Sequence, residues 1–218
     1  MFVKICGITT VDDALLAAGM GADAIGMIFA ASPRQVTPAQ AGAILEQVPD
    51  EVLTVGVFRD HPIDEVIATA TGLGLRAVQL HGAETPDDVA RVAARIPRVI
   101  KVFPAGAPEL ADAGRYRARL MIDSPSPGSG MVFDWAVLDG TPLRRRFILA
   151  GGLDPDNVVE AIHTVRPWGV DLASGVEAAP GRKDGDKLRR FMAAVRAQPD
   201  PDPPDHWDTP DNWEENPT

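Results

Sequence analysis

The sequence predicts an α/β protein folded as a (β/α)8 TIM barrel, a closed ring of eight parallel strands surrounded by helices. Three observations support this prediction. Short β-branched runs alternate with amphipathic, alanine-rich stretches. The runs recur roughly every 20–28 residues, which is the spacing of strand–helix units. Eight such units fit into about 200 residues, whereas an open sheet usually stops at about five to seven strands.

The elements follow one another in strict alternation along the chain. The expected strands are Phe2–Cys6, Asp23–Phe29, Val52–Phe58, Ala77–Leu80, Val99–Phe103, Arg119–Asp123, Phe147–Ala150 and Val170–Ala173. The expected helices are Val11–Met20, Pro38–Gln47, Pro62–Ala70, Pro86–Arg95, Pro108–Tyr116, a short one near Trp135, Pro155–Val165 and Asp186–Ala197. Several helices begin with proline, whose missing N–H costs no hydrogen bond in the first turn. Asp154 is expected to cap the helix that begins at Pro155.

The chain is expected to form one domain, residues 1–198, followed by a tail, residues 199–218. Hydrophobic residues make up 45% of the sequence, enough for a sizeable core. The tail is rich in proline and acid and has no periodicity, so we expect it to be disordered and solvated. Its two tryptophans, Trp207 and Trp213, leave open the alternative that the tail docks on the barrel or on a partner.

Charge and composition exclude several classes of protein. The formal charge is −10, and the seven carboxylates of the tail account for −7 of it, which leaves −3 on residues 1–198. A nucleic-acid-binding protein needs a basic surface, which this balance does not supply. No apolar run approaches the roughly 20 residues of a membrane span, and the first residues do not resemble a secretion signal. With one cysteine, Cys6, no intramolecular disulfide can form, so we expect a cytoplasmic protein.

Polar side chains gather at the carboxyl ends of the expected strands, where barrel enzymes place their chemistry. Residues two apart share a face of a strand, so Lys4 and Cys6 point the same way, as do Gln79 and His81. Their apolar neighbours suit the helix layer, and the polar pairs should therefore face the barrel interior. Strands one and eight become neighbours on closure, so Lys4 should pair with Asp171 inside the barrel.

Cys6 and Asp123 are candidates for proton transfer, each with a plainer alternative. A lone buried cysteine is usually a small apolar residue. Cys6, however, ends the first strand, and a cation such as Lys4 would lower the pKa of its thiol and make it a usable base. An aspartate after a strand is often a turn former or a helix cap. Asp123 precedes a Gly/Ser/Pro loop whose closure would exclude water, and spacing alone leaves both interpretations open.

Two loops predict a phosphate site. Gly151 and Gly152 follow strand seven, and Ser174 and Gly175 follow strand eight. These are the two loops that bind phosphate in TIM barrels through backbone N–H groups, although each could be an ordinary helix-entry turn. Arg34 follows strand two and is either a solvated loop residue or a fork for a carboxylate. No cluster of His, Cys and Asp has metal-ligand spacing, so no metal is expected.

Taken together, these residues resemble the phosphoribosylanthranilate isomerase family. The matching stretches run in order over the body of the chain, to about Arg196, and their combination is highly specific. They are KICGIT at 4–9, GADAIGMIF at 21–29, SPR at 32–34, VGVF at 55–58, AVQLHG at 77–82, ID at 122–123, GSG and FDW within 128–135, LAGGLDPDNV at 149–158, and VDLASGVE with G.KD at 170–184. The acidic tail is not part of the family pattern.

The resemblance implies an Amadori rearrangement in tryptophan biosynthesis, with no cofactor. It converts N-(5-phosphoribosyl)anthranilate into 1-(2-carboxyphenylamino)-1-deoxyribulose 5-phosphate. Asp123 would protonate the ring oxygen, Cys6 would remove the proton on the second sugar carbon, and Arg34 would hold the anthranilate carboxylate. The resemblance further places His81 and Asp171 near the substrate, and Gly151, Gly152, Ser174 and Gly175 at its phosphate. The expected partner is this small phosphosugar, and the sequence leaves monomer and homodimer open.

Two alternative functions are a dual-substrate isomerase and a non-catalytic metabolite-binding barrel. The dual-substrate isomerase of histidine and tryptophan biosynthesis has Asp where Cys6 stands, and a glycine pair after strand three that this chain lacks. A non-catalytic metabolite-binding barrel would have no need to retain Cys6 and Asp123 together. The chain departs from the family pattern in the loop after strand six, where Pro127 replaces a glycine and Met131 a basic residue.

Overall fold

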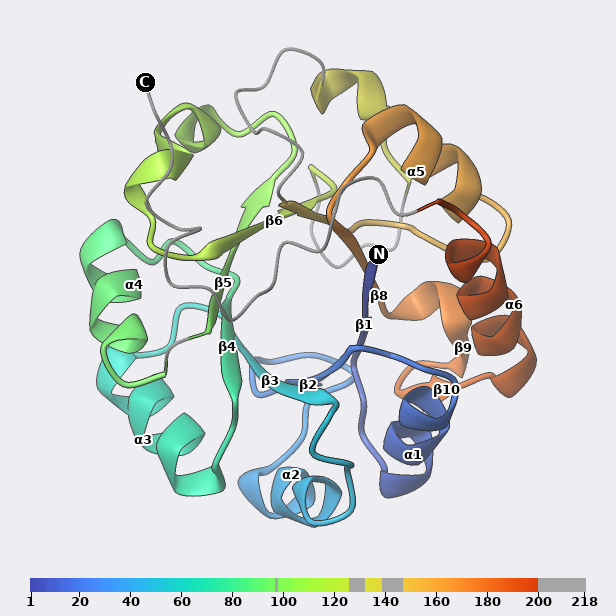
Figure 1. Ribbon diagram of the computed structural model, residues 1–218. Coiled ribbons are helices and arrows are strands. Elements are labelled where there is room, and N and C mark those ends of the chain that lie inside the picture. Colours follow the sequence, from blue (N-terminus) through green and yellow to red (C-terminus); the bar gives the residue numbers. More distant parts are fainter. Residues whose placement is uncertain (97, 126–131, 139–146, 200–218) are drawn as a thin grey trace.

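The fold is a closed barrel of eight parallel strands (Figure 1). This computed structural model describes residues 1–96, 98–125, 132–138 and 147–199. The strands are β1 (Phe2–Cys6), β2 (Ala24–Ile28), β3 (Leu53–Phe58), β4 (Ala77–Leu80), β5 (Val99–Pro104), β6 (Arg119–Asp123), β7 (Phe147–Leu149) and β8 (Gly169–Leu172). They follow one another in chain order, and β8 closes the ring against β1. The predicted (β/α)8 fold is confirmed.

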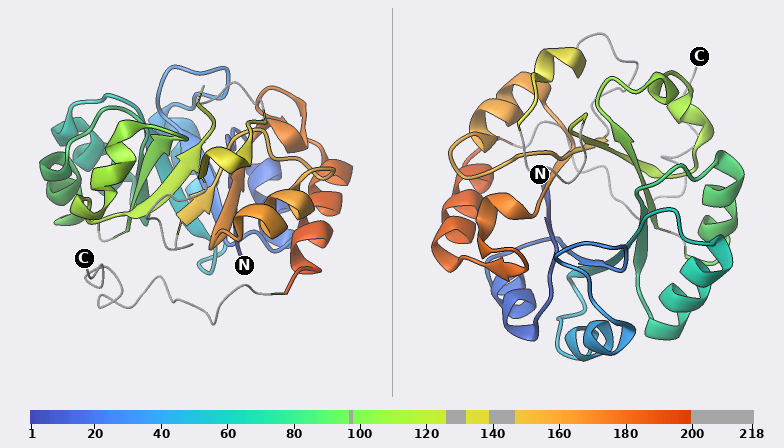
Figure 2. Two further views of the ribbon diagram at one scale, coloured as in Figure 1. Left: turned by 90° about the horizontal axis from the view of Figure 1, so that it is seen from above. Right: turned by 180° about the vertical axis from the view of Figure 1, so that it is seen from behind.

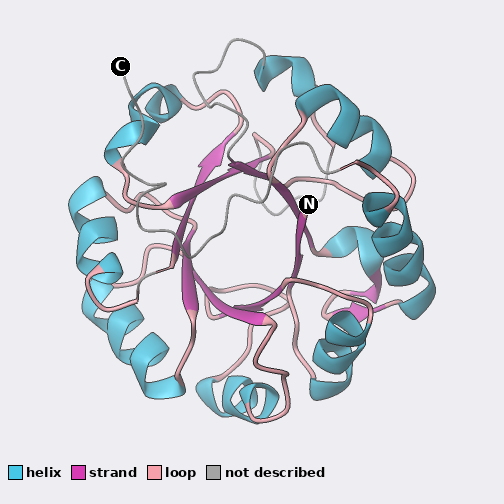
Figure 3. Cartoon of the chain, in the orientation of Figure 1, coloured by secondary structure: helices cyan, strands magenta, loops and turns pink. Residues whose placement is uncertain are grey.

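Helices surround the ring of strands (Figure 3), as views from above and from behind also show (Figure 2). The α-helices are α1 (Val11–Gly19), α2 (Pro38–Leu45), α3 (Ile63–Leu73), α4 (Pro86–Ala93), α5 (Val158–Val165) and α6 (Gly185–Arg196). The 3-10 helices are η1 (Pro108–Arg115), η2 (Trp135–Leu138) and η3 (Ser174–Val176). The helices α2 and α4 begin at Pro38 and Pro86, as predicted, and Thr37 and Thr85 form capping boxes before them. The expected helix Pro108–Tyr116 is present as the 3-10 helix η1.

Asp154 does not cap α5, contrary to the prediction. Its carboxylate accepts hydrogen bonds from the backbone N–H groups of Asp156 (2.8 Å) and Asn157 (3.0 Å), which form a turn. Asn157 takes the N-cap position, and α5 begins at Val158 rather than Pro155. The Nδ2 of Asn157 also donates to the carbonyl oxygen of Gly152 (2.9 Å). This turn therefore holds the glycine-containing loop that precedes the helix.

A short antiparallel hairpin follows β8 and was not predicted. It consists of β9 (Glu177–Ala179) and β10 (Arg182–Lys183), and it lies between α1 and α6 (Figure 1). Gly181 stands between the two strands with a φ of +78°, in the left-handed region that favours glycine. Strands of two and three residues are too short to show the alternation by which a strand is recognised in a sequence.

Strand alternation separates two apolar layers. Val3, Ile5, Val78 and Leu80 pack outward against the helices, as predicted. The inner face of the ring carries a smaller apolar cluster: Ala24, Leu53, Val55, Ala77, Ile100, Val102, Met121, Ile148 and Ala150. Polar residues continue this inner face toward the carboxyl ends of the strands.

Lys4 and Asp171 form a buried ion pair inside the barrel, which confirms the prediction. They are register partners on β1 and β8, and Lys4 Nζ donates to Asp171 Oδ1 over 2.7 Å. Desolvation alone would lower the pKa of Lys4, but Asp171 and Cys6 outweigh that effect, so the pKa of Lys4 is raised. A fixed positive charge therefore lies beneath the end of β1.

Candidate active site

A pocket of about 360 Å³ opens among the carboxyl ends of the strands. Its walls come from the ends of β1, β2, β3, β4, β6 and β8 and from the loops after β2, β3, β4, β7 and β8. Most of the site residues predicted from the sequence line it: Cys6, Arg34, His81, Asp123, Gly151, Gly152, Asp171 and Ser174. A cavity of this size suits a small ligand.

Cys6 is buried at the end of β1, with 6% of its surface exposed. Gly26 of β2 leaves room for it, because a Cβ there would lie 2.9 Å from Cys6 Sγ and 3.1 Å from Lys4 Nζ. Burial raises the pKa of the thiol above its ordinary value, and the lowering by Lys4 and Lys183 does not offset it. The expectation that Lys4 would give a lowered thiol pKa is therefore wrong, although Lys4 does act in that direction.

Asp123 ends β6, and its two carboxylate oxygens have different neighbours. Oδ1 accepts from the backbone N–H of Ser124 (2.7 Å), the contact expected of a turn former. Oδ2 lies 3.4 Å from His81 Nε2. On the other side of the imidazole, His81 Nδ1 lies 3.3 Å from Gln79 Nε2. If that amide donates, Nδ1 accepts and Nε2 carries the proton that faces Asp123.

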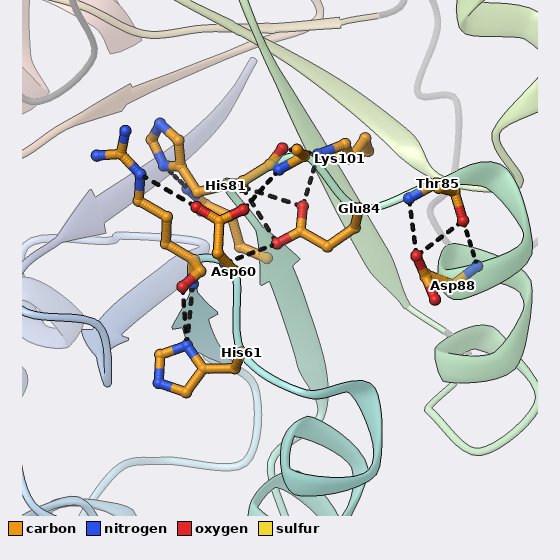
Figure 4. Close-up of polar contacts among 11 residues, drawn as sticks. Asp60, His61, His81, Glu84, Thr85, Asp88 and Lys101 are labelled. Carbon is orange, nitrogen blue, oxygen red and sulfur yellow. Dashed lines mark hydrogen bonds and ion pairs between the residues drawn. The ribbon is translucent and has the colours of Figure 1, made fainter.

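A buried ion pair holds the loop that begins at His81 (Figure 4). Lys101 Nζ donates to Glu84 Oε2 (2.6 Å) and to the carbonyl oxygen of Gly82 (2.5 Å). The Glu84 carboxylate in turn accepts from the backbone N–H groups of Gly82 (3.0 Å) and Asp60 (3.2 Å). A Cβ at Gly82 would lie 2.1 Å from Asp60 Oδ1, so the loops after β3 and β4 touch at this glycine. The cluster thus joins both loops to β5.

The loops after β7 and β8 lie in contact, as the phosphate prediction requires. Gly151 and Gly152 have φ values of +94° and +67°, in the region that favours glycine, and both line the pocket beside Ser174. Gly175 is not a lining residue. A Cβ there would lie 2.0 Å from the carbonyl oxygen of Leu153, so this glycine lets the two loops pack closely. The binding of phosphate by these residues stays a prediction.

Arg34 forms the predicted carboxylate fork, but its partner is Glu177 of the same chain. Arg34 Nε donates to Oε1 (2.8 Å) and Oε2 (3.1 Å), and Nη2 donates to Oε2 (2.7 Å). The stem of Arg34 crosses the turn after β1, where a Cβ at Gly7 would lie 2.6 Å from Arg34 Cδ. Arg34 also lines the pocket, so its contact with a substrate carboxylate stays a prediction.

The sequence reasoning missed two residues of the site, Arg59 and Glu177. Arg59 follows β3 and lines the pocket with an exposed side chain, its Nε 3.9 Å from Asp60 Oδ2. Nothing in the sequence separates it from other solvated arginines after strands. Glu177 stood in a matching stretch, SGVE, but its contact with Arg34 joins positions far apart in the chain.

The predictions about metal sites and membrane helices can be compared with the described residues alone. Within the described residues, no group of three or more His, Cys, Asp or Glu side chains is placed to hold a metal ion. The helices in the same part of the chain are all too short or too polar to cross a membrane. Pro127 and Met131 lie outside the described residues, as do Trp207 and Trp213 of the tail.

Comparison with known proteins identifies the family. The model of the family described as N-(5'-phosphoribosyl)anthranilate (PRA) isomerase matches residues 3–194. An N-(5'-phosphoribosyl)anthranilate isomerase from Pelobacter propionicus is 45% identical over 199 residues, which cover 89% of this chain and 95% of the relative. The phosphoribosyl anthranilate isomerase structure from Thermus thermophilus has a TM-score of 0.83 and 42% identity, covering 90% of this chain and 98% of its own.

A second similar structure carries a ligand. This phosphoribosyl anthranilate isomerase was solved in complex with reduced 1-(o-carboxyphenylamino)-1-deoxyribulose 5-phosphate. It has a TM-score of 0.80 and 38% identity, and the match covers 91% of this chain and 100% of the other. With a family model matched over most of its length, this chain belongs to the N-(5'-phosphoribosyl)anthranilate isomerase family.

Proposed function

We propose that Cys6 as general base and Asp123 as general acid carry out the reaction of the family. That reaction is the Amadori rearrangement of N-(5-phosphoribosyl)anthranilate to 1-(2-carboxyphenylamino)-1-deoxyribulose 5-phosphate. The chain is an intramolecular isomerase of tryptophan biosynthesis. The observation that supports the two roles is that Cys6, at the end of β1, and Asp123, at the end of β6, line one pocket.

The two groups act in succession. Asp123 in its protonated form gives a proton to the ring oxygen of the ribose, and the ring opens to a Schiff base. The thiolate of Cys6 then removes the proton from the second sugar carbon. The resulting enolamine gains a proton on the first carbon and becomes the ketone. This shift needs one acid and one base and no redox partner, and each group contributes about 10²–10⁴-fold to the rate.

The surroundings of Cys6 suit a base that forms rarely but reacts strongly. Burial raises the pKa of its thiol, so little thiolate is present at neutral pH. A thiolate whose conjugate acid has a raised pKa accepts a proton more readily once it is formed. Lys4, held by Asp171, stabilises the thiolate and limits the rise in pKa.

The remaining site residues, in the pocket and at its edge, bind the substrate. Backbone N–H groups at Gly151, Gly152, Ser174 and Gly175 hold its phosphate. Arg34 meets the anthranilate carboxylate, while His81 and Asp171 lie beside the sugar. The ligand of the solved relative supports this division, since it carries a phosphate, an open-chain sugar and a carboxyphenyl group.

The proposal also covers the domain boundaries, the cellular compartment, the oligomeric state and the absence of a cofactor. Residues 1–198 form the catalytic domain, to which the tail, residues 199–218, is not essential. The protein works in the cytoplasm on a small-molecule phosphosugar, as a monomer or homodimer, without a metal or cofactor. The single cysteine supports a reducing compartment, where no disulfide is needed.

An activity assay tests the proposed function. The purified full-length chain should consume phosphoribosylanthranilate in the presence of EDTA, seen as a loss of the substrate's fluorescence. The aminoaldose substrate of histidine biosynthesis, run in parallel, should stay unchanged. Conversion of both compounds would point to the dual-substrate isomerase instead. Conversion of neither would point to the non-catalytic barrel.

A further inference from the structure

We propose that Glu177 is a positioning residue that aims the guanidinium of Arg34 into the pocket, and that Lys183 fixes Glu177 in place. The β9–β10 hairpin, which carries both residues, would then serve substrate binding. This inference deepens the proposed function, because it rests on the proposed contact between Arg34 and the substrate carboxylate.

The contact between Arg34 and Glu177 determines which N–H groups of the guanidinium remain available to a substrate carboxylate. The fork uses Nε and Nη2 of Arg34, at 2.7 to 3.1 Å from the two carboxylate oxygens. Two parallel hydrogen bonds hold a planar guanidinium in one orientation, whereas one bond leaves it free to rotate. The end of the guanidinium, with Nη1 and the second N–H of Nη2, is then the part that a substrate carboxylate can meet.

Glu177 is itself held firmly enough to act as a support. Its side chain is 4% exposed, and its Oε1 accepts from Lys183 Nζ over 3.0 Å. Burial alone would raise the pKa of Glu177, but Arg34 and Lys183 outweigh it, so the pKa of Glu177 is lowered. The carboxylate therefore stays ionised between two cations.

Lys183 connects this support to the catalytic end of the barrel. Its buried Nζ also donates to the carbonyl oxygens of Cys6 (2.7 Å), the last residue of β1, and Ala173 (3.2 Å), the residue after β8. The backbone N–H of Lys183 donates to Asp13 Oδ2 of α1 (3.1 Å). The position of Arg34 is thereby fixed relative to Cys6, through one glutamate and one lysine.

Glu177→Gln tests the proposal. Glutamine keeps the shape of the side chain but accepts only through one oxygen and has no charge. We expect KM to rise about tenfold or more, the effect of losing about one charge-assisted hydrogen bond, while kcat changes less than about threefold. Glu177→Asp keeps the charge on a shorter side chain, so its KM should lie between those of the wild type and Glu177→Gln. The matched control is Glu160→Gln, an exposed position on α5, which should leave both constants unchanged.

A pair of inhibitors separates positioning from general support of the fold. One inhibitor is reduced 1-(o-carboxyphenylamino)-1-deoxyribulose 5-phosphate, and the other is the same compound with a phenyl group that lacks the carboxylate. The inhibition constants of both are measured on the wild type and on Glu177→Gln. The substitution should weaken the carboxylated compound about tenfold or more and the phenyl compound less than about twofold. Equal weakening of both would overturn the proposal, because Glu177 would then not act through the carboxylate contact.

In Glu177→Gln, Lys183 loses the carboxylate with which it pairs, and a double variant tests whether this loss causes the rise in KM. If the rise in KM came from the stranded charge of Lys183, Glu177→Gln with Lys183→Met would restore KM. We expect no restoration, since Arg34 still lacks its support, and restoration would contradict the positioning role. These outcomes are distinct from a failure of the proposed function, in which the wild-type chain itself would not convert the substrate.

Discussion

Replacement of Cys6 by alanine should lower kcat about 10²–10⁴-fold and leave the barrel folded. The reason is that the thiolate is the group that removes the proton from the second sugar carbon. The Lys4–Asp171 pair beneath Cys6 remains intact in the variant. The loss should appear in kcat rather than in KM, because the base acts on the transition state. Steady-state turnover and thermal unfolding of the variant provide the two measurements.

Cys6→Ser is the control for shape. The hydroxyl fills nearly the same space between Gly26 and Lys4, so no cavity is left in the buried site. A hydroxyl without an adjacent base is far too weakly acidic to act in place of the thiolate. The serine variant should therefore be as slow as the alanine variant. Turnover close to that of the wild type in either variant would show that Cys6 is only a packed apolar residue.

Asp123→Asn should also lower kcat about 10²–10⁴-fold, with little change in KM. Asparagine can still accept the hydrogen bond from the Ser124 N–H through Oδ1, so the local turn is kept. It has no acidic proton to give to the ring oxygen, and ring opening becomes slow. Asp134→Asn, at the start of η2, is the control, since its carboxylate makes a similar local bond to the Ala136 N–H but lies outside the pocket. Equal rates for wild type and Asp123→Asn would reduce Asp123 to a turn former.

The parts of the fold set by strand geometry could be predicted from the sequence. Alternation with a period of two placed Lys4 and Cys6 on one face, and closure of the ring made β1 and β8 neighbours. Those two rules allowed Lys4 to pair with Asp171, and the register of β1 against β8 sets the two residues opposite each other. The same rules brought Cys6, His81 and Asp123 to one rim, since parallel strands end on the same side.

The remaining features depend on distances that no local pattern encodes. The raised pKa of Cys6 reflects the depth of its burial, whereas only the nearby charge of Lys4 could be read from the sequence. The Arg34–Glu177 fork joins two loops far apart in the chain. The prediction for Asp154 failed because its side chain satisfies a turn over residues 155–157, so α5 starts three residues later than expected, with Asn157 at the N-cap position.

The most direct test of the paired roles is the isotope effect of substrate deuterated at the second sugar carbon, measured on Cys6→Ser and Asp123→Asn. In Cys6→Ser, proton removal from that carbon should limit the residual turnover, so the deuterated substrate should react markedly more slowly. In Asp123→Asn, ring opening should limit turnover, and both substrates should react at nearly the same rate. An isotope effect confined to Asp123→Asn, or of equal size in both variants, would contradict the assignment of base and acid.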